Sequence, residues 1–211
     1  MFKTTLLKSF QIAIILGSCF LGGSLKANTF TPERLIEESF FDETTAKAKY
    51  RHPHPMAVHW CTGGSANNEL IEIENGSVWK VSPFDTNKTR AWCAGDPIVI
   101  TQNSSWLWFS EFAFVFHNMR TYQSVEVNIT APPHSDSTKN HWIQTIDLLS
   151  GIIELENAKF WGIHSSDLSK VQAWEEDDWI MVGMNDGWSS LKHPEILINA
   201  RTRDFIRVRD M

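Results

Sequence analysis

The stretch Ile71-Glu72-Ile73-Glu74-Asn75 recurs 82 residues later as Ile153-Glu154-Leu155-Glu156-Asn157. In both stretches apolar and acidic side chains alternate, which is the period of a strand with one buried face. The same offset of 82 aligns Trp79 with Trp161, Trp92 with Trp174, Asp96 with Asp178, and Trp106 with Trp188. One residue is then lost, and an offset of 81 aligns Asn118 with Asn199. We therefore predict a tandem duplication.

Turn signals divide each copy into short strands. Asn75-Gly76 is a strong hairpin signal because both residues tolerate positive φ, and Asn157-Ala158 fits the same turn less well. The predicted strands are 70–73, 78–81, 98–101, 112–116 and 124–129 in the first copy, and 152–155, 160–163, 179–183, 195–198 and 204–208 in the second. A leading strand is predicted before each copy, over 58–61 and 142–146. The fold class is therefore mainly β, a duplicated barrel-like repeat of about five or six strands.

The segments outside the copies set the domain organisation. We predict a signal peptide over 1–27, a helix and Pro/His-rich linker over 28–57, repeat one over 58–130, a linker over 131–140 and repeat two over 141–211. Thr31-Pro32 is a suitable helix start, with Thr31 as N-cap.

The N-terminus resembles an export signal. Lys3 and Lys8 precede an apolar run, Ile12 to Leu21, that is shorter than a membrane span, and we expect cleavage after Ala27. In an alternative interpretation Leu16 to Cys19 is a lipobox and Cys19 is lipidated. Either way the mature protein is secreted, periplasmic or at the cell envelope, with no stable membrane span.

Charge and composition exclude some partners. The net charge is −6, which argues against nucleic acid because its phosphates select a basic surface. Ten tryptophans in 211 residues supply ample material for a core.

Cys61 and Cys93 remain after export. In an oxidising compartment the pair is compatible with a disulfide, and equally with two unpaired thiols.

The shared residues suit the fold more than a function. Two copies in one chain retain core tryptophans and turn-binding polar groups, so we interpret Trp79, Trp161, Trp92, Trp174, Asp96, Asp178, Asn118 and Asn199 as structural. The loop aromatics Trp106, Trp108 and Trp188 lie among amides and hydroxyls, where they could anchor a protein or glycan or fold back over the barrel end.

A metal site is a second possibility. His52, His54, His59 and Cys61 offer imidazole and thiolate ligands for zinc or copper, but their spacing matches no zinc pattern, and Pro53 and Pro55 also suit a stiff linker. No other cofactor is predicted.

Catalytic motifs are absent from the sequence: no nucleophile elbow, phosphate-binding glycine loop or His-Glu-x-x-His is present. This favours a protein that is not an enzyme.

The run Glu74 to Trp79 followed by Trp-x-x-x-Asp, an Asn-x-x-Trp segment and a closing Ile196 to Asn199 resembles a group of small exported tandem-repeat β-proteins of obligate intracellular bacteria. The resemblance spans about 60–208. It implies a bacterial envelope or secreted protein and no particular activity.

Three functional hypotheses follow. The first is a non-catalytic binding or interaction module at or beyond the cell envelope. The second is an extracytoplasmic metal-handling protein. The third is a hydrolase whose site lies between the two repeats, and a cleft at that junction is the feature it requires.

Overall fold

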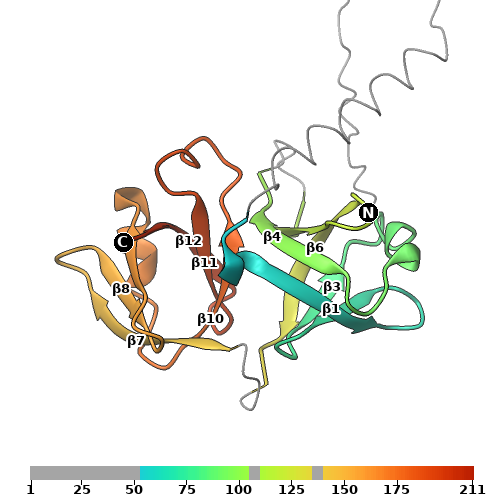
Figure 1. Ribbon diagram of the computed structural model, residues 1–211, viewed down its shortest axis with the longest axis horizontal. Helices are drawn as coiled ribbons and strands as arrows, with labels where there is room; N and C mark the ends of the chain where they lie inside the picture. The colour runs from blue at the N-terminus through green and yellow to red at the C-terminus, as the bar shows by residue number, and fades with distance from the viewer. Residues whose placement is uncertain (1–52, 105–109, 135–139) are drawn as a thin grey trace, which may run out of the picture.

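The computed structural model describes residues 53–104, 110–134 and 140–211 and is mainly β. The predicted signal peptide, Cys19 and the helix beginning near Thr31 lie outside these ranges. Within them, no helix has the length and apolarity needed to cross a membrane. The strands form two six-stranded rings that lie side by side (Figure 1), so the predicted β-barrel architecture is confirmed.

The first ring follows the order β1-β2-β3-β6-β5-β4 and closes through β1–β4 pairing. Its strands are β1 (Val58–Gly64), β2 (Leu70–Ile73), β3 (Val78–Val81), β4 (Pro97–Gln102), β5 (Phe114–Asn118) and β6 (Ser124–Ala131). All of its pairings are antiparallel. Closure leaves this sheet without a free edge.

The second ring has the corresponding order β7-β8-β9-β12-β11-β10 and closes through β10–β7 pairing. Its strands are β7 (His141–Asp147), β8 (Ile152–Leu155), β9 (Phe160–Ile163), β10 (Trp179–Met184), β11 (Glu195–Asn199) and β12 (Asp204–Asp210). The short helices are η1 (Pro55–Ala57), η2 (Lys88–Ala91), η3 (Ser165–Asp167) and α2 (Leu168–Val171).

Each predicted hairpin turn is present, but only its second residue takes positive φ, whereas Asn75 and Asn157 do not. Gly76 has φ 79° and Ala158 has φ 59°, so alanine takes the left-handed region in the second ring. Asn75 Oδ1 accepts a hydrogen bond from Ser77 N at 2.9 Å, which fixes the first turn. A side chain at Gly76 would also collide with the ring of His134.

The two core tryptophans, Trp79 and Trp161, are completely buried at corresponding positions. Trp79 packs on Phe114 and Phe116 and donates its Nε1 hydrogen to Ser77 Oγ at 2.8 Å. Trp174 is buried and Trp92 is partly buried. The tryptophan side chains pack in the barrel cores, where each removes a large apolar area from water.

A buried carboxylate ties together the loop and strand ends in each ring. Asp96 accepts hydrogen bonds from Arg120 Nε at 2.5 Å, Asn118 Nδ2 at 2.7 Å and Cys93 N at 2.9 Å. The Arg120 hydrogen bond is the main reason that the pKa of Asp96 falls to about 2. Asp178 makes the same contacts with Arg201, Asn199 and Glu175 N in the second ring.

The two rings pack through apolar side chains of β10 and β11. Met181, Ile196 and Ile198 belong to the same buried cluster as the core of the first ring. Phe114 and Phe205, one from each ring, lie 6.0 Å apart. Parallel pairing of Met184 with Thr101 joins β10 to β4.

The segment before β1 packs on the second ring although it precedes the first. Ala57 is buried in the second core, and the ring of His54 lies 5.4 Å from that of Trp161. His54 Nε2 also lies 3.5 Å from an oxygen of Asp210. This part of the Pro/His-rich segment is therefore packed against the neighbouring ring.

Candidate functional site

The loop between β10 and β11 presents a large aromatic side chain to solvent. Trp188 is 84% exposed, in contrast to the buried tryptophans of the cores. An indole that remains in water is available to a partner. The alternative from the sequence, in which Trp188 folds back over the barrel end, does not occur. We call this residue with its neighbours His164, His193 and Arg207 the Trp188 site.

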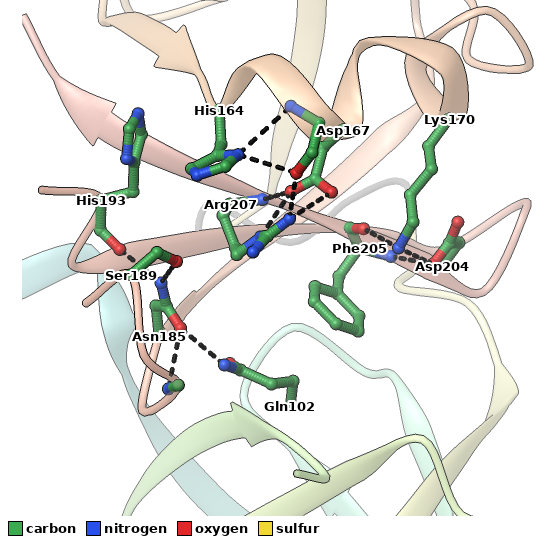
Figure 2. A network of polar contacts seen from close by, with 12 residues as sticks. Gln102, His164, Asp167, Lys170, Asn185, Ser189, His193, Asp204, Phe205 and Arg207 are labelled. Atoms are coloured by element: carbon green, nitrogen blue, oxygen red, sulfur yellow. Dashed lines mark hydrogen bonds and ion pairs between the residues drawn. The ribbon is translucent and has the colours of Figure 1, made fainter.

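The base of the loop is held by a buried asparagine (Figure 2). Asn185 Nδ2 donates to His193 O at 2.6 Å and to Ser189 Oγ at 3.0 Å, and Asn185 Oδ1 accepts from Gly187 N at 2.9 Å. The side-chain amide of Gln102 in the first ring contacts the same Oδ1 at 2.6 Å. Because both ends of the loop are fixed, Trp188 is displayed on an ordered scaffold.

Arg207 lies beside the indole of Trp188 and is held there by Asp167. Asp167 binds its guanidinium in a bidentate manner, with both N–O distances at 2.8 Å, and only 5% of the Asp167 side chain is exposed. The hydrogen bond to Asp167 is the main reason that the pKa of Arg207 is raised. The guanidinium carbon lies 5.6 Å from the centre of the Trp188 ring, within the range of a cation–π interaction.

Two histidines border the indole on the second ring. His164 lies edge-on to Trp188 at 5.8 Å and 4.7 Å from His193, measured between ring centroids. His164 Nδ1 accepts from Ser166 N at 3.3 Å, so His164 caps η3. Burial, followed by the nearby His164, lowers the pKa of His193. The site thus combines one aromatic plane, one guanidinium and two imidazoles.

The corresponding surface of the first ring carries the opposite charge. With the offset of 81 residues that applies to this part of the chain, Arg207 aligns with Glu126. The backbone contact is kept, because Glu126 N donates to Asp85 as Arg207 N donates to Asp167. Glu126, however, accepts hydrogen bonds from Asn103 and Ser110, so the guanidinium–indole pair is particular to the second ring.

Trp106 and Trp108 lie outside the described residues. Ser104, the last described residue before them, donates to Asp186 Oδ1 at 3.1 Å. The loop that carries these tryptophans therefore begins beside the Trp188 loop, although the two are about 80 residues apart in sequence.

The structure does not bring the predicted metal ligands together. His52 lies outside the described ranges, and His54 packs on Trp161 of the second ring. Both ring nitrogens of His59 are engaged, Nδ1 with Glu74 and Nε2 with Val182 O, each at 2.9 Å. In the part of the chain that is described, no three metal-ligating His, Cys, Asp or Glu side chains converge.

The Cys61–Cys93 disulfide is absent, and both cysteines are free. They line the same pocket of about 160 Å³, but Cys61 is buried and Cys93 is exposed. Each sulfur lies near a carbonyl of its own segment, Gly63 O at 3.7 Å and Ala91 O at 3.9 Å. Cys61 thus serves as a small core residue, at the position that Ile143 occupies in the second ring.

The junction of the rings does contain a cavity, of about 310 Å³. Its polar lining residues are His59 and Glu74 from the first ring and His141 from the second. Among its described lining residues there is no serine, threonine, cysteine or lysine to act as a nucleophile.

The sequence singled out Trp188 but not its surroundings. Arg207, Asp167 and His164 come from η3 and β12, which are distant from residue 188 in sequence. The change from Glu126 to Arg207 between otherwise matching positions is the one signal that could have pointed to them. Comparisons with protein-family models, curated proteins and solved structures found no match.

Proposed function

We propose that the protein is a non-catalytic binding module and that Trp188 is its anchor for a partner protein. The observation that carries the proposal is a tryptophan 84% exposed on a loop that buried hydrogen bonds hold in place. Tryptophan and arginine dominate binding energy at protein interfaces, and here they lie side by side. A fixed loop also loses little conformational entropy on binding.

The charges around the Trp188 site favour an acidic partner surface. Lys192 lies in the loop itself, and the positive charges of Arg207 and Arg209 act on His193. With Asp167 paired to Arg207 and Asp186 in the loop, three basic and two acidic residues leave a small positive excess here, in a chain whose net charge is −6. A partner that places an apolar side chain on the indole and carboxylates around it would complement both properties.

The setting we infer is extracytoplasmic. Its support is the predicted signal peptide over 1–27 and the resemblance to exported bacterial repeat proteins. We also infer that the two rings are duplicated copies, supported by their aligned sequences and their equivalent strand orders. The two copies differ at this position, where the second has Arg207 and the first has Glu126.

The test is photo-crosslinking in the source cells, followed by affinity measurement with the captured protein. A benzophenone amino acid at position 188 should capture one protein that the same probe at Leu149 does not capture. Leu149 is a fully exposed apolar residue in the turn between β7 and β8 of the second ring, so it is the matched control. Trp188→Ala should then weaken binding at least tenfold and Leu149→Ala less than twofold. Equal losses, or capture of the same proteins at both positions, would contradict the proposal.

A further inference from the structure

The cavity at the junction of the rings is formed by four segments that are distant in sequence. Pro55 and Met56 come from η1, Val58 and His59 from β1, Glu74 from the end of β2, His141 from β7, and Ile180 and Met181 from β10. Its volume of about 310 Å³ lies at the lower end of the range for small-molecule sites. It is separate from the Trp188 site, which follows the opposite end of β10.

A histidine and a glutamate recur at this junction, one pair from each ring. His59 Nδ1 lies 2.9 Å from Glu74 Oε1, and His141 Nδ1 lies 2.7 Å from Glu156 Oε1. The second oxygen of each glutamate accepts a backbone hydrogen bond, from Trp60 N and Trp142 N respectively. Each carboxylate therefore orients its imidazole.

The two imidazoles differ at Nε2. His59 Nε2 donates to the carbonyl of Val182 at 2.9 Å, so this ring has no nitrogen left for a ligand. Within the described ranges, Nε2 of His141 has no hydrogen-bond partner, and His141 lines the cavity. The carbonyl corresponding to Val182, that of Ile100, is covered by β10 at Gly183. The packing of the two barrels therefore gives His59 Nε2 a partner in β10 and leaves His141 lining the cavity.

The chemistry of the wall defines what this imidazole can bind. When the imidazole of His141 is neutral and Glu156 accepts its Nδ1 hydrogen, Nε2 presents a lone pair that accepts a hydrogen bond. The thioethers of Met56 and Met181, with Ile180, supply a polarizable apolar wall that suits an aromatic ring. The carboxylate of Glu74 in the wall, and that of Glu156 bonded to the far side of His141, disfavour an anion.

We propose that the junction cavity is a binding site for a small aromatic molecule that carries a hydroxyl or amine group. The ring lies against Met56 and Met181, and the polar group donates a hydrogen bond to His141 Nε2. This site would give the module a ligand-dependent contact between its two rings.

Three probes of similar size test this assignment: phenol has the ring and the donor, toluene has only the ring, and benzoate has the ring and a negative charge. Binding to the full chain is followed by NMR of the methionine methyl groups. Phenol should shift the methyl signals of Met56 and Met181 saturably and leave that of Met119 unchanged. Toluene and benzoate should bind at least fivefold more weakly than phenol.

Variants then test the hydrogen bond. His141→Asn keeps a donor to Glu156 but removes the acceptor that faces the cavity, so phenol affinity should fall about fivefold while toluene affinity stays the same. His164→Asn changes a histidine outside the cavity and should leave both affinities unchanged. The assignment is wrong if phenol shifts neither methionine in the wild-type chain, if toluene binds as well as phenol, or if benzoate binds best. The wild-type measurements decide this even if a variant does not fold.

Discussion

Glu195 occupies a buried position in β11 where the aligned residue of the first ring is Phe114. In the first ring, Phe114 packs against Trp79 at 5.6 Å between ring centroids. In the described part of the second ring, neither Glu195 Oε2 nor Trp161 Nε1 has a hydrogen-bond partner. Burial first, and the charge of Asp210 second, raise the pKa of Glu195 to about 7. The second ring is therefore less favourably packed here than the first.

This single carboxyl makes stability depend on pH. Its folded pKa of about 7 exceeds the ordinary value of 4.5, so the folded state binds the proton more tightly and stability falls as pH rises from 4.5 to 7. We expect the loss to be about 3 kcal/mol by pH 8. Glu195→Gln keeps the shape without the charge, so it should raise the free energy of unfolding at pH 8 and have little effect at pH 4.5.

Urea denaturation of the wild type and the variant at both pH values measures this difference. Glu111→Gln, at an exposed position, is the control and should change neither value. A Glu195→Gln variant whose gain is the same at pH 4.5 and pH 8 would show that Glu195 is not the titrating group.

At the scale of elements, β10 approaches β4 closely because of one glycine. A Cβ at Gly183 would lie 2.6 Å from Ile100 O and 2.9 Å from Ile196 Cγ1. The aligned residue of the first ring is Thr101. The first ring thus accommodates the side chain of Thr101. The second ring has no room for a side chain at Gly183, because the backbone of β4 lies against it.

Gly183→Ala should therefore separate β10 from β4. We expect destabilisation of about 2–3 kcal/mol, since Ile100 O belongs to the backbone of β4 and β10 is held by its pairing with β11. Gly63→Ala is the matched control, because a Cβ at this β1 position meets no atom within 4 Å. Chemical denaturation compares the two, and an equal effect of both substitutions would contradict the close contact of β10 with β4.

At the scale of the whole molecule, the second ring contributes to the core of the first, and the segment before β1 contributes to the core of the second. Met181, Ile196 and Ile198 of the second ring are buried in the cluster of the first, and Ala57, which precedes the first ring, is buried in the second. The rings therefore share buried apolar area, which unfolding of either one would expose.

The two rings should accordingly unfold in one cooperative transition. Calorimetry should give a single peak whose calorimetric and van't Hoff enthalpies agree, although β1–β4 and β10–β7 pairing closes two distinct rings. Ile198→Ala should lower the midpoint of that one peak rather than split it. Two resolved peaks in the wild type would show that the rings are energetically independent.

The sequence by itself predicted most of the strands, the turn at Asn75-Gly76 and a barrel-like repeat of five or six strands, whereas the closure into six-stranded rings came from the structure. The strands and the turn follow from local rules, because the alternation of apolar residues and the φ preferences of turn residues act over only a few positions. The burial of Trp79 and Trp161 also follows from their strand positions. The position of Trp188 in a loop was recognisable for the same reason, but the exposure of its side chain was not.

Only the tertiary structure decided how distant residues meet. It placed Arg207 beside Trp188, His54 on the second ring and His141 in a cavity with His59, and it left Cys61 and Cys93 unbonded. The Arg207–Trp188 contact and the separation of the two cysteines depend on the loops within one ring, whereas the positions of His54 and His141 depend on how the two rings pack. The alternation of apolar residues along a strand carries no information about either. Steric exclusion at Gly183 and shared apolar burial set the orientation of one ring against the other.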